Sequence, residues 1–159
     1  MTLATNQVSA MKSLLVALSC FGLFSTFAHA ADLNGVWRTI DDKSGIVRAH
    51  VKMEKQPDGS YTGTIIEDFP AAGETPLTKC NNCPAPYTNK PIIGLEILKG
   101  FKEEANNPNN FSHGKVLDPR HGKIYNGKAK LSSDGRKFRL RGYVGVSMLG
   151  RSQTWLRKD

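Results

Sequence analysis

Apolar and polar residues alternate with a period of two along most of the chain after residue 30, which is the pattern of half-buried β-strands. The clearest run is residues 47–54, in which Val, Ala, Val and Met alternate with Arg, His, Lys and Glu. The same alternation, with basic residues in the polar places, occupies residues 125–131 and 137–144. Pro57-Asp58-Gly59 and Asp134-Gly135 are turn sequences beside these runs. The pattern therefore predicts β-hairpins.

Five shorter runs of the same kind bring the expected number of strands to about eight. They lie at residues 37–40, 61–68, 92–98, 111–117 and 152–158. No stretch after residue 30 keeps a helical period over ten or more residues. We expect residues 31–159 to form one all-β domain, a small antiparallel up-and-down β-barrel that leaves no strand edge free. A two-sheet β-sandwich is the alternative.

Two segments interrupt the alternation. Residues 69–91 contain five prolines and a cysteine pair, so they cannot form a central strand. Residues 102–113 are polar, and we expect residues 106–110 to form a loop. A connection as long as the first either borders a functional site or is a surface excursion. The pattern leaves both open.

The first thirty residues have the layout of a secretory signal peptide. Lys12 precedes an uncharged, mostly apolar run to residue 28, and Ala28-His29-Ala30 is a small-x-small cleavage sequence. The run is shorter than the roughly 20 residues that a membrane-spanning helix needs. We expect translation to start at Met11, cleavage to follow Ala30, and residues 31–159 to be periplasmic or secreted rather than integral to the membrane.

The positive charge of the mature chain is concentrated near its C-terminus. Residues 31–109 carry 9 basic and 11 acidic residues, whereas residues 110–159 carry 12 basic and 3 acidic residues. If Asp134-Gly135 forms the turn, cations of the two strands lie opposite one another on one face, although like charges in cross-strand pairs are unfavourable. The predicted basic surface patch consists of Lys128, Lys130, Lys137 and Arg139. For an exported protein it indicates anionic envelope material rather than nucleic acid, or else a solvated charged face.

Two cysteines, Cys80 and Cys83, remain after cleavage, and in an oxidising compartment they predict a disulfide. A redox site is disfavoured because Pro84 and Pro86 follow at once and no βαβ pattern surrounds the pair. Zinc needs two more ligands, and the spacing of the histidines at 113 and 121 is outside the usual range. We therefore expect no metal and no cofactor.

The two ends of the domain resemble the calycin superfamily, which includes lipocalins, fatty-acid-binding proteins and avidins. Gly35-Val36-Trp37 opens the first strand, and Trp155-Leu156-Arg157 closes the last. In calycins a Gly-x-Trp on the first strand meets an arginine from the last strand. The resemblance implies that Arg157 stacks on the Trp37 ring, with Trp37, Trp155 and Arg157 as structural residues.

Several further blocks, in order along the chain, resemble an exported bacterial family known as domain of unknown function 2147. The blocks are Cys80-x-x-Cys83-Pro84, residues 90–95, 114–119, 122–125, 141–145 and 150–155. The resemblance implies a small secreted β-rich domain. It brings no established activity and no catalytic residues.

The leading functional hypothesis is binding of a small apolar or amphipathic ligand, such as a lipid or envelope fragment, inside the barrel or at its mouth. The candidate ligand-binding residues are Trp37, Tyr125, Phe138, Arg141, Val144 and Arg151. One alternative is an envelope interaction protein that uses its basic outer face. A second is an enzyme with a site at one barrel end near Asp118, His121 and Arg151, although Asp118-Pro119-Arg120-His121-Gly122 is also a typical turn sequence.

Overall fold

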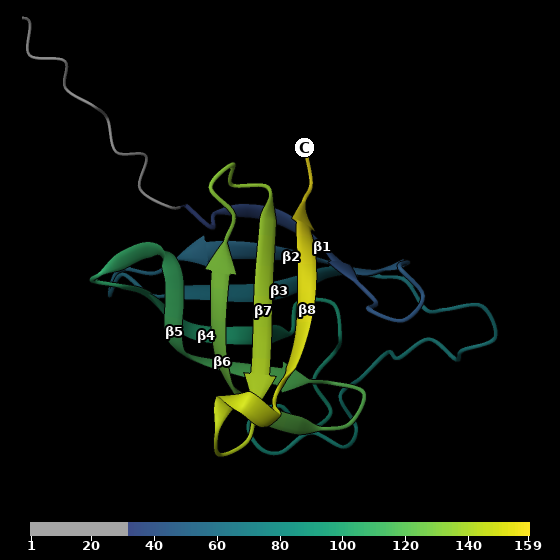
Figure 1. Ribbon diagram of the computed structural model, residues 1–159. Helices are drawn as coiled ribbons and strands as arrows, with labels where there is room; N and C mark the ends of the chain where they lie inside the picture. The colour runs from purple at the N-terminus through teal and green to yellow at the C-terminus, as the bar shows by residue number, and fades with distance from the viewer. Residues whose placement is uncertain (1–31) are drawn as a thin grey trace, which may run out of the picture.

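Eight antiparallel strands in chain order close into one barrel, as predicted, and the β-sandwich alternative is wrong. The computed structural model describes residues 32–159, so the predicted signal peptide lies outside the described residues. In Figure 1, β7 and β8 lie in front of β2 and β3 and cross them steeply. The strands are β1 (Gly35–Ile40), β2 (Val47–Lys55), β3 (Tyr61–Asp68), β4 (Glu96–Glu104), β5 (Asn107–Asp118), β6 (Lys123–Leu131), β7 (Lys137–Tyr143) and β8 (Arg151–Arg157), with a 3-10 turn, η1 (Ser147–Leu149), before β8.

The polar segment 102–113 does not interrupt the sheet, which corrects the prediction. β4 continues to Glu104 and β5 begins at Asn107, so the two strands pair almost to the hairpin turn. Phe101 and Phe111 are fully buried on the inner face of these strands. The residues between these two apolar side chains are half-buried or exposed, so polar residues are accommodated there within paired strands.

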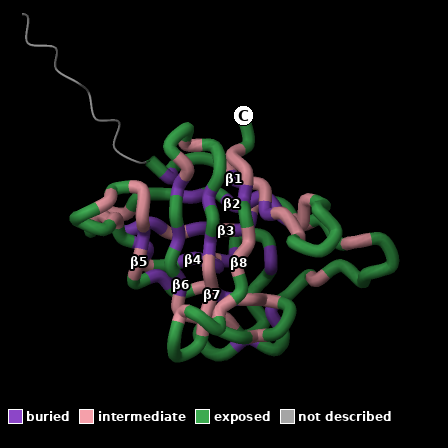
Figure 2. Tube along the Cα trace, in the orientation of Figure 1, coloured by how far each residue is buried: buried purple, intermediate pink, exposed green. Residues whose placement is uncertain are grey.

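The core lies inside the barrel, where the inward residues of all eight strands meet (Figure 2). Phe138 is at its centre, with ring centroids of four other aromatic residues within 6.5 Å. These neighbours are Trp37, Phe101, Phe111 and Trp155. The Phe101 ring is accommodated by glycines, since a Cβ at Gly114 would lie 2.3 Å from it. The centre of the barrel is therefore filled with side chains.

The predicted stacking of Arg157 on Trp37 is confirmed. The guanidinium carbon lies 4.4 Å from the Trp37 ring centroid. Arg157 also donates hydrogen bonds to three backbone carbonyls, those of Asp32, Asn34 and Gly135. The Trp37 indole N–H donates to the carbonyl of Leu33, which is itself fully buried. These contacts close one end of the barrel.

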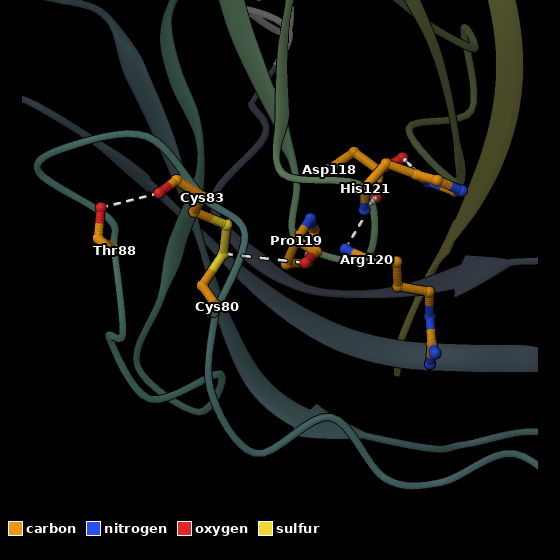
Figure 3. The surroundings of a disulfide bond; sticks show 7 residues. All are labelled: Cys80, Cys83, Thr88, Asp118, Pro119, Arg120 and His121. Carbon is orange, nitrogen blue, oxygen red and sulfur yellow. Dashed lines mark hydrogen bonds and ion pairs between the residues drawn. A yellow bond between two sulfur atoms is a disulfide. The ribbon is translucent and has the colours of Figure 1, made fainter.

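The proline-rich segment 69–91 is a loop, as predicted, apart from an isolated bridge between Lys79 and Pro91. Cys80 and Cys83 form the predicted disulfide and are buried. Cys80 Sγ lies 3.9 Å from the carbonyl oxygen of Pro119, so the disulfide rests against the β5–β6 turn (Figure 3). A Cβ at Gly122 would lie 1.9 Å from the carbonyl oxygen of Asn82. The loop is thus packed closely against that turn.

Candidate functional site

Two rows of polar side chains cross the outer face of β5–β8. The register confirms that cation faces cation, because Lys128 pairs with Arg141 and Lys130 pairs with Arg139. The row through Lys130 and Arg139 continues to Asn110 on β5 and Thr154 on β8. The row through Lys128 and Arg141 continues to Ser152 on β8. Side chains directly opposite on neighbouring strands have Cβ atoms about 5 Å apart.

Except for Thr154, the residues of these rows line an open groove with a volume of about 420 Å³. Sites for small ligands commonly have volumes of about 300–1,000 Å³. The lining residues are Glu104, Asn110, Phe111, Lys128, Ala129, Lys130, Arg139, Arg141 and Ser152. We call this feature the basic groove.

The central cations of the basic groove are not neutralised. Within residues 32–159, no acidic side chain lies at ion-pair distance from Lys130 or Arg139. Glu104 also lines the groove, but its carboxylate accepts a 3.4 Å hydrogen bond from the Asn110 amide. In each of two cross-strand pairs one cation lies opposite another, and the Asn110 amide and the Ser152 hydroxyl lie beside them. The groove is therefore suited to an anion with several oxygen atoms.

Arg141 and Lys128 also fix the chain that connects β7 to β8. Arg141 donates to the carbonyls of Ser147 and Met148, at 2.6 and 2.8 Å, and to the Ser152 hydroxyl at 3.0 Å. Lys128 Nζ donates to the Ser147 hydroxyl at 3.0 Å. The row through Lys128 and Arg141 is therefore held in place by the fold, and Arg141 has a structural role as well as a place in the groove.

The structure does not bring the six predicted ligand-binding residues together. Trp37 and Phe138 are fully buried in the aromatic core, Tyr125 is half-buried on β6, and Arg141 lies on the outer face. Val144 was predicted to face inward, but β7 ends at Tyr143 and the Val144 side chain is 70% exposed. That prediction is wrong because the strand stops one residue earlier than its alternating pattern.

Arg151, the sixth residue, forms an ion pair with Asp42 in the β1–β2 connection. Arg151 Nε donates to Asp42 Oδ2 at 3.0 Å. The hydrogen bonds from Arg151 hold the pKa of Asp42 below its ordinary value. This guanidinium therefore already has an anionic partner within the protein.

Asp118 and His121 lie together in the β5–β6 turn (Figure 3). His121 Nδ1 and Asp118 Oδ2 are 2.7 Å apart. Asp118 Oδ1 accepts hydrogen bonds from the backbone N–H groups of Arg120 and His121, at 3.0 and 3.2 Å. This is the bonding of an aspartate that stabilises a turn. In the part of the chain that the structure describes, no group of three or more His, Cys, Asp or Glu is placed to hold a metal ion.

Of the predicted basic patch, Lys128, Lys130 and Arg139 line the groove and Lys137 does not, and the sequence patterns missed the neutral polar residues of the groove. Asn110 and Ser152 come from strands other than the β6–β7 hairpin, and only the register across four strands places them beside the cations. The exposed apolar side chains of residues 144–149 were also missed, because the alternating pattern assigned the start of this segment to a strand.

Comparisons with known proteins agree with this fold. The profile of the family described as "Uncharacterized protein conserved in bacteria (DUF2147)" matches residues 35–157. The chain belongs to this family. The resemblance of the sequence blocks to that family is thus confirmed, and the match spans the whole barrel, from β1 to β8.

A solved protein from the human pathogen Helicobacter pylori, described as belonging to the lipocalin family, has a similar structure. The TM-score is 0.66 at 20% sequence identity, over 81% of this chain and 84% of that chain. At this identity the likeness shows a lipocalin-like fold, which agrees with the calycin resemblance of the sequence. No curated protein sequence is similar enough to this chain to match it. Within residues 32–159, no helix is long and apolar enough to span a bilayer.

Proposed function

We propose that this protein is an exported binding protein that holds the anionic head group of a small amphipathic ligand in the basic groove. The observation that carries the proposal is the pair of directly opposed cations, Lys130 and Arg139, which have no acidic partner in residues 32–159. Like charges in this position repel one another. A phosphate or carboxylate between them replaces that repulsion with charge-assisted hydrogen bonds.

The filled barrel favours the groove over the interior as the place for the head group. A ligand that used Trp37 and Phe138 directly would have to displace rings that are in contact with each other at 5.6 Å between centroids. In the groove, Lys128, Lys130 and Arg139 are exposed and the volume of about 420 Å³ is open. The lipocalin-like fold supports the small-ligand class by analogy alone.

The test is calorimetric titration of residues 31–159 with hexyl phosphate, with hexanol as the neutral control ligand. The double variant Lys130→Glu/Arg139→Glu is expected to bind hexyl phosphate at least about tenfold more weakly. Binding to the unaltered protein is expected to weaken as salt is added, because the groove is open to solvent.

The matched control is Lys52→Glu/Lys99→Glu, which makes the same change in net charge on β2 and β4. Both lysines are exposed and belong to surface ion pairs, which contribute little to stability. Their replacement is expected to leave the affinity for hexyl phosphate close to that of the unaltered protein. An equal loss in both double variants contradicts a localised site and indicates a general effect of net charge.

Export is tested by expressing the full chain in a Gram-negative host and measuring the mass of the protein in the periplasmic fraction. The expected mass is that of residues 31–159 with the Cys80–Cys83 disulfide. Protein that stays in the cytoplasm with residues 1–30 attached contradicts the proposed location.

A further inference from the structure

The connection between β7 and β8 exposes four large apolar side chains within six residues. Their exposed fractions are 70% for Val144, 63% for Val146, 87% for Met148 and 84% for Leu149. The other exposed large apolar residues in 32–159 range from 37% to 55% and lie in separate parts of the sequence. Single exposed apolar residues are ordinary, but a cluster of this kind marks a surface that meets an apolar partner.

The barrel holds this connection in position. Arg141 binds the carbonyls of Ser147 and Met148, and Lys128 binds the Ser147 hydroxyl. The backbone adds the 3-10 hydrogen bond from Leu149 N–H to the Val146 carbonyl, at 3.3 Å. Polar atoms of the connection are therefore bound to the barrel while its apolar side chains face solvent. Binding of an apolar partner then requires little further ordering of the chain.

The same two residues, Lys128 and Arg141, join the apolar connection to the basic groove. Three acidic groups elsewhere at this end of the barrel have basic side chains beside them: Asp42 pairs with Arg151, Glu74 with Arg48 and Arg120, and Asp118 with the imidazole of His121. The exposed surface thus combines an apolar tip with uncompensated cations beside it. Figure 1 places the tip at the end of β7 and β8 opposite to the C-terminus.

We propose that residues 144–149 insert into the interface of a lipid bilayer that contains anionic lipids, with the basic groove facing the phosphates of the adjacent head groups. Apolar side chains flanked by cations are the chemistry of interfacial binding to an anionic membrane. An anionic bilayer matches both parts of the surface at once. This docking goes beyond the proposed function, because it requires the apolar connection, which binding of a free ligand in the groove does not.

The experiment measures binding to vesicles of phosphatidylethanolamine and phosphatidylglycerol by co-sedimentation. The double variant Met148→Asp/Leu149→Asp is expected to bind these vesicles at least about tenfold more weakly, while its affinity for hexyl phosphate stays unchanged. The matched control is Ile46→Asp/Ile93→Asp, which makes the same change in net charge at apolar positions that are 43% and 55% exposed in other loops, and it is expected to bind as the unaltered protein does.

A second variant, Met148→Trp, reports insertion directly. Its emission spectrum, after subtraction of the spectrum of the unaltered protein with Trp37 and Trp155, is expected to shift to shorter wavelength with the anionic vesicles and not with phosphatidylcholine vesicles. Unchanged sedimentation of Met148→Asp/Leu149→Asp with the vesicles, or no shift of the Met148→Trp emission, overturns the proposal. A concentration-dependent dimer in sedimentation velocity that Met148→Asp/Leu149→Asp abolishes, without vesicle binding by either protein, also overturns it and assigns the connection to a second copy of the chain.

Discussion

The two faces of the β6–β7 hairpin differ in how their cross-strand pairs affect stability. On the inner face, Ala129 is opposite Leu140 and Leu131 is opposite Phe138, so apolar groups pack together. On the outer face, Lys130 is opposite Arg139, and like charges face each other. The inner face contributes to folding. The opposed pair of Lys130 and Arg139 does not favour folding, so its arrangement is better explained by a ligand than by stability.

The largest effect is expected from breaking the inner face. Replacement Phe138→Ala removes the ring at the centre of the aromatic cluster and leaves a cavity, which lowers the free energy of unfolding by about 3–5 kcal/mol. Denaturant unfolding measures this loss. The control is Val144→Ala, a change at a 70% exposed side chain, which is expected to alter stability by less than about 0.5 kcal/mol. Equal effects from the two changes contradict a core centred on Phe138.

The interior of the barrel is not packed equally tightly at every strand, and glycines on β5 and β7 test this difference. Replacement Gly114→Ala places a Cβ 2.3 Å from the Phe101 ring, so we expect a loss of about 1–3 kcal/mol from overpacking. Replacement Gly142→Ala places a Cβ 3.5 Å from Tyr125 Cβ, an ordinary contact, and a much smaller loss is expected. Thermal unfolding of the two variants compares the sites. A larger loss for Gly142→Ala contradicts the described packing.

Substitutions on the inner face are expected to lower stability, whereas a charge reversal on the outer face is expected to raise it. Lys130→Glu turns a repulsive pair with Arg139 into an attractive one, so the free energy of unfolding rises by a few tenths of a kcal/mol. The same change weakens binding of hexyl phosphate. Denaturant unfolding and calorimetry on one variant test both effects, with Lys52→Glu as the control for stability. A variant that loses stability and keeps its affinity contradicts the proposed role of this pair.

Acid stability is expected to depend on carboxylates in turns rather than on either face of the hairpin. Hydrogen bonds from the Ser60 side chain and backbone lower the pKa of Asp58 to about 2, and those from Ser132 and the Arg136 N–H lower the pKa of Asp134. A lowered folded-state pKa stabilises the protein above the ordinary carboxyl pKa, and this stabilisation is lost as pH falls toward 2. The measurement is the free energy of unfolding by denaturant at pH values between about 2 and the ordinary carboxyl pKa. Asp58→Asn is expected to make this free energy less dependent on pH. A pH dependence that Asp58→Asn leaves unaltered contradicts this assignment.

The sequence predicted the fold well because a barrel of this size is determined by alternation and turns. Alternating apolar residues predicted the strands at residues 47–54 and 137–143, and the Asp134-Gly135 turn predicted that cations of the hairpin lie opposite one another. Alternation failed where the chain leaves the sheet: it could not show that β7 ends before Val144. It also could not show that polar residues 102–113 remain paired between the buried Phe101 and Phe111.

The candidate site was predicted only in part, for a related reason. Cations on one hairpin can be assigned to a face from their spacing, so Lys128, Lys130 and Arg139 were found. Asn110 and Ser152 enter the site because β5 and β8 pair with the two strands of the hairpin, which no local pattern encodes. The predicted interior site relied on fold analogy, and analogy does not show how far side chains fill a barrel.

The central claim is that a ligand binds the outer face of β5–β8 and not the filled interior. Titration of isotope-labelled residues 31–159 with hexyl phosphate, followed by amide chemical shifts in two-dimensional NMR spectra, locates the site residue by residue. The account predicts that the largest shifts occur at Asn110, Lys130, Arg139, Arg141 and Ser152, which line the groove or continue its rows. Shifts confined to the inward positions Tyr125, Gly142 and Gln153, with the groove residues unaltered, would contradict it and return the site to the mouth of the barrel.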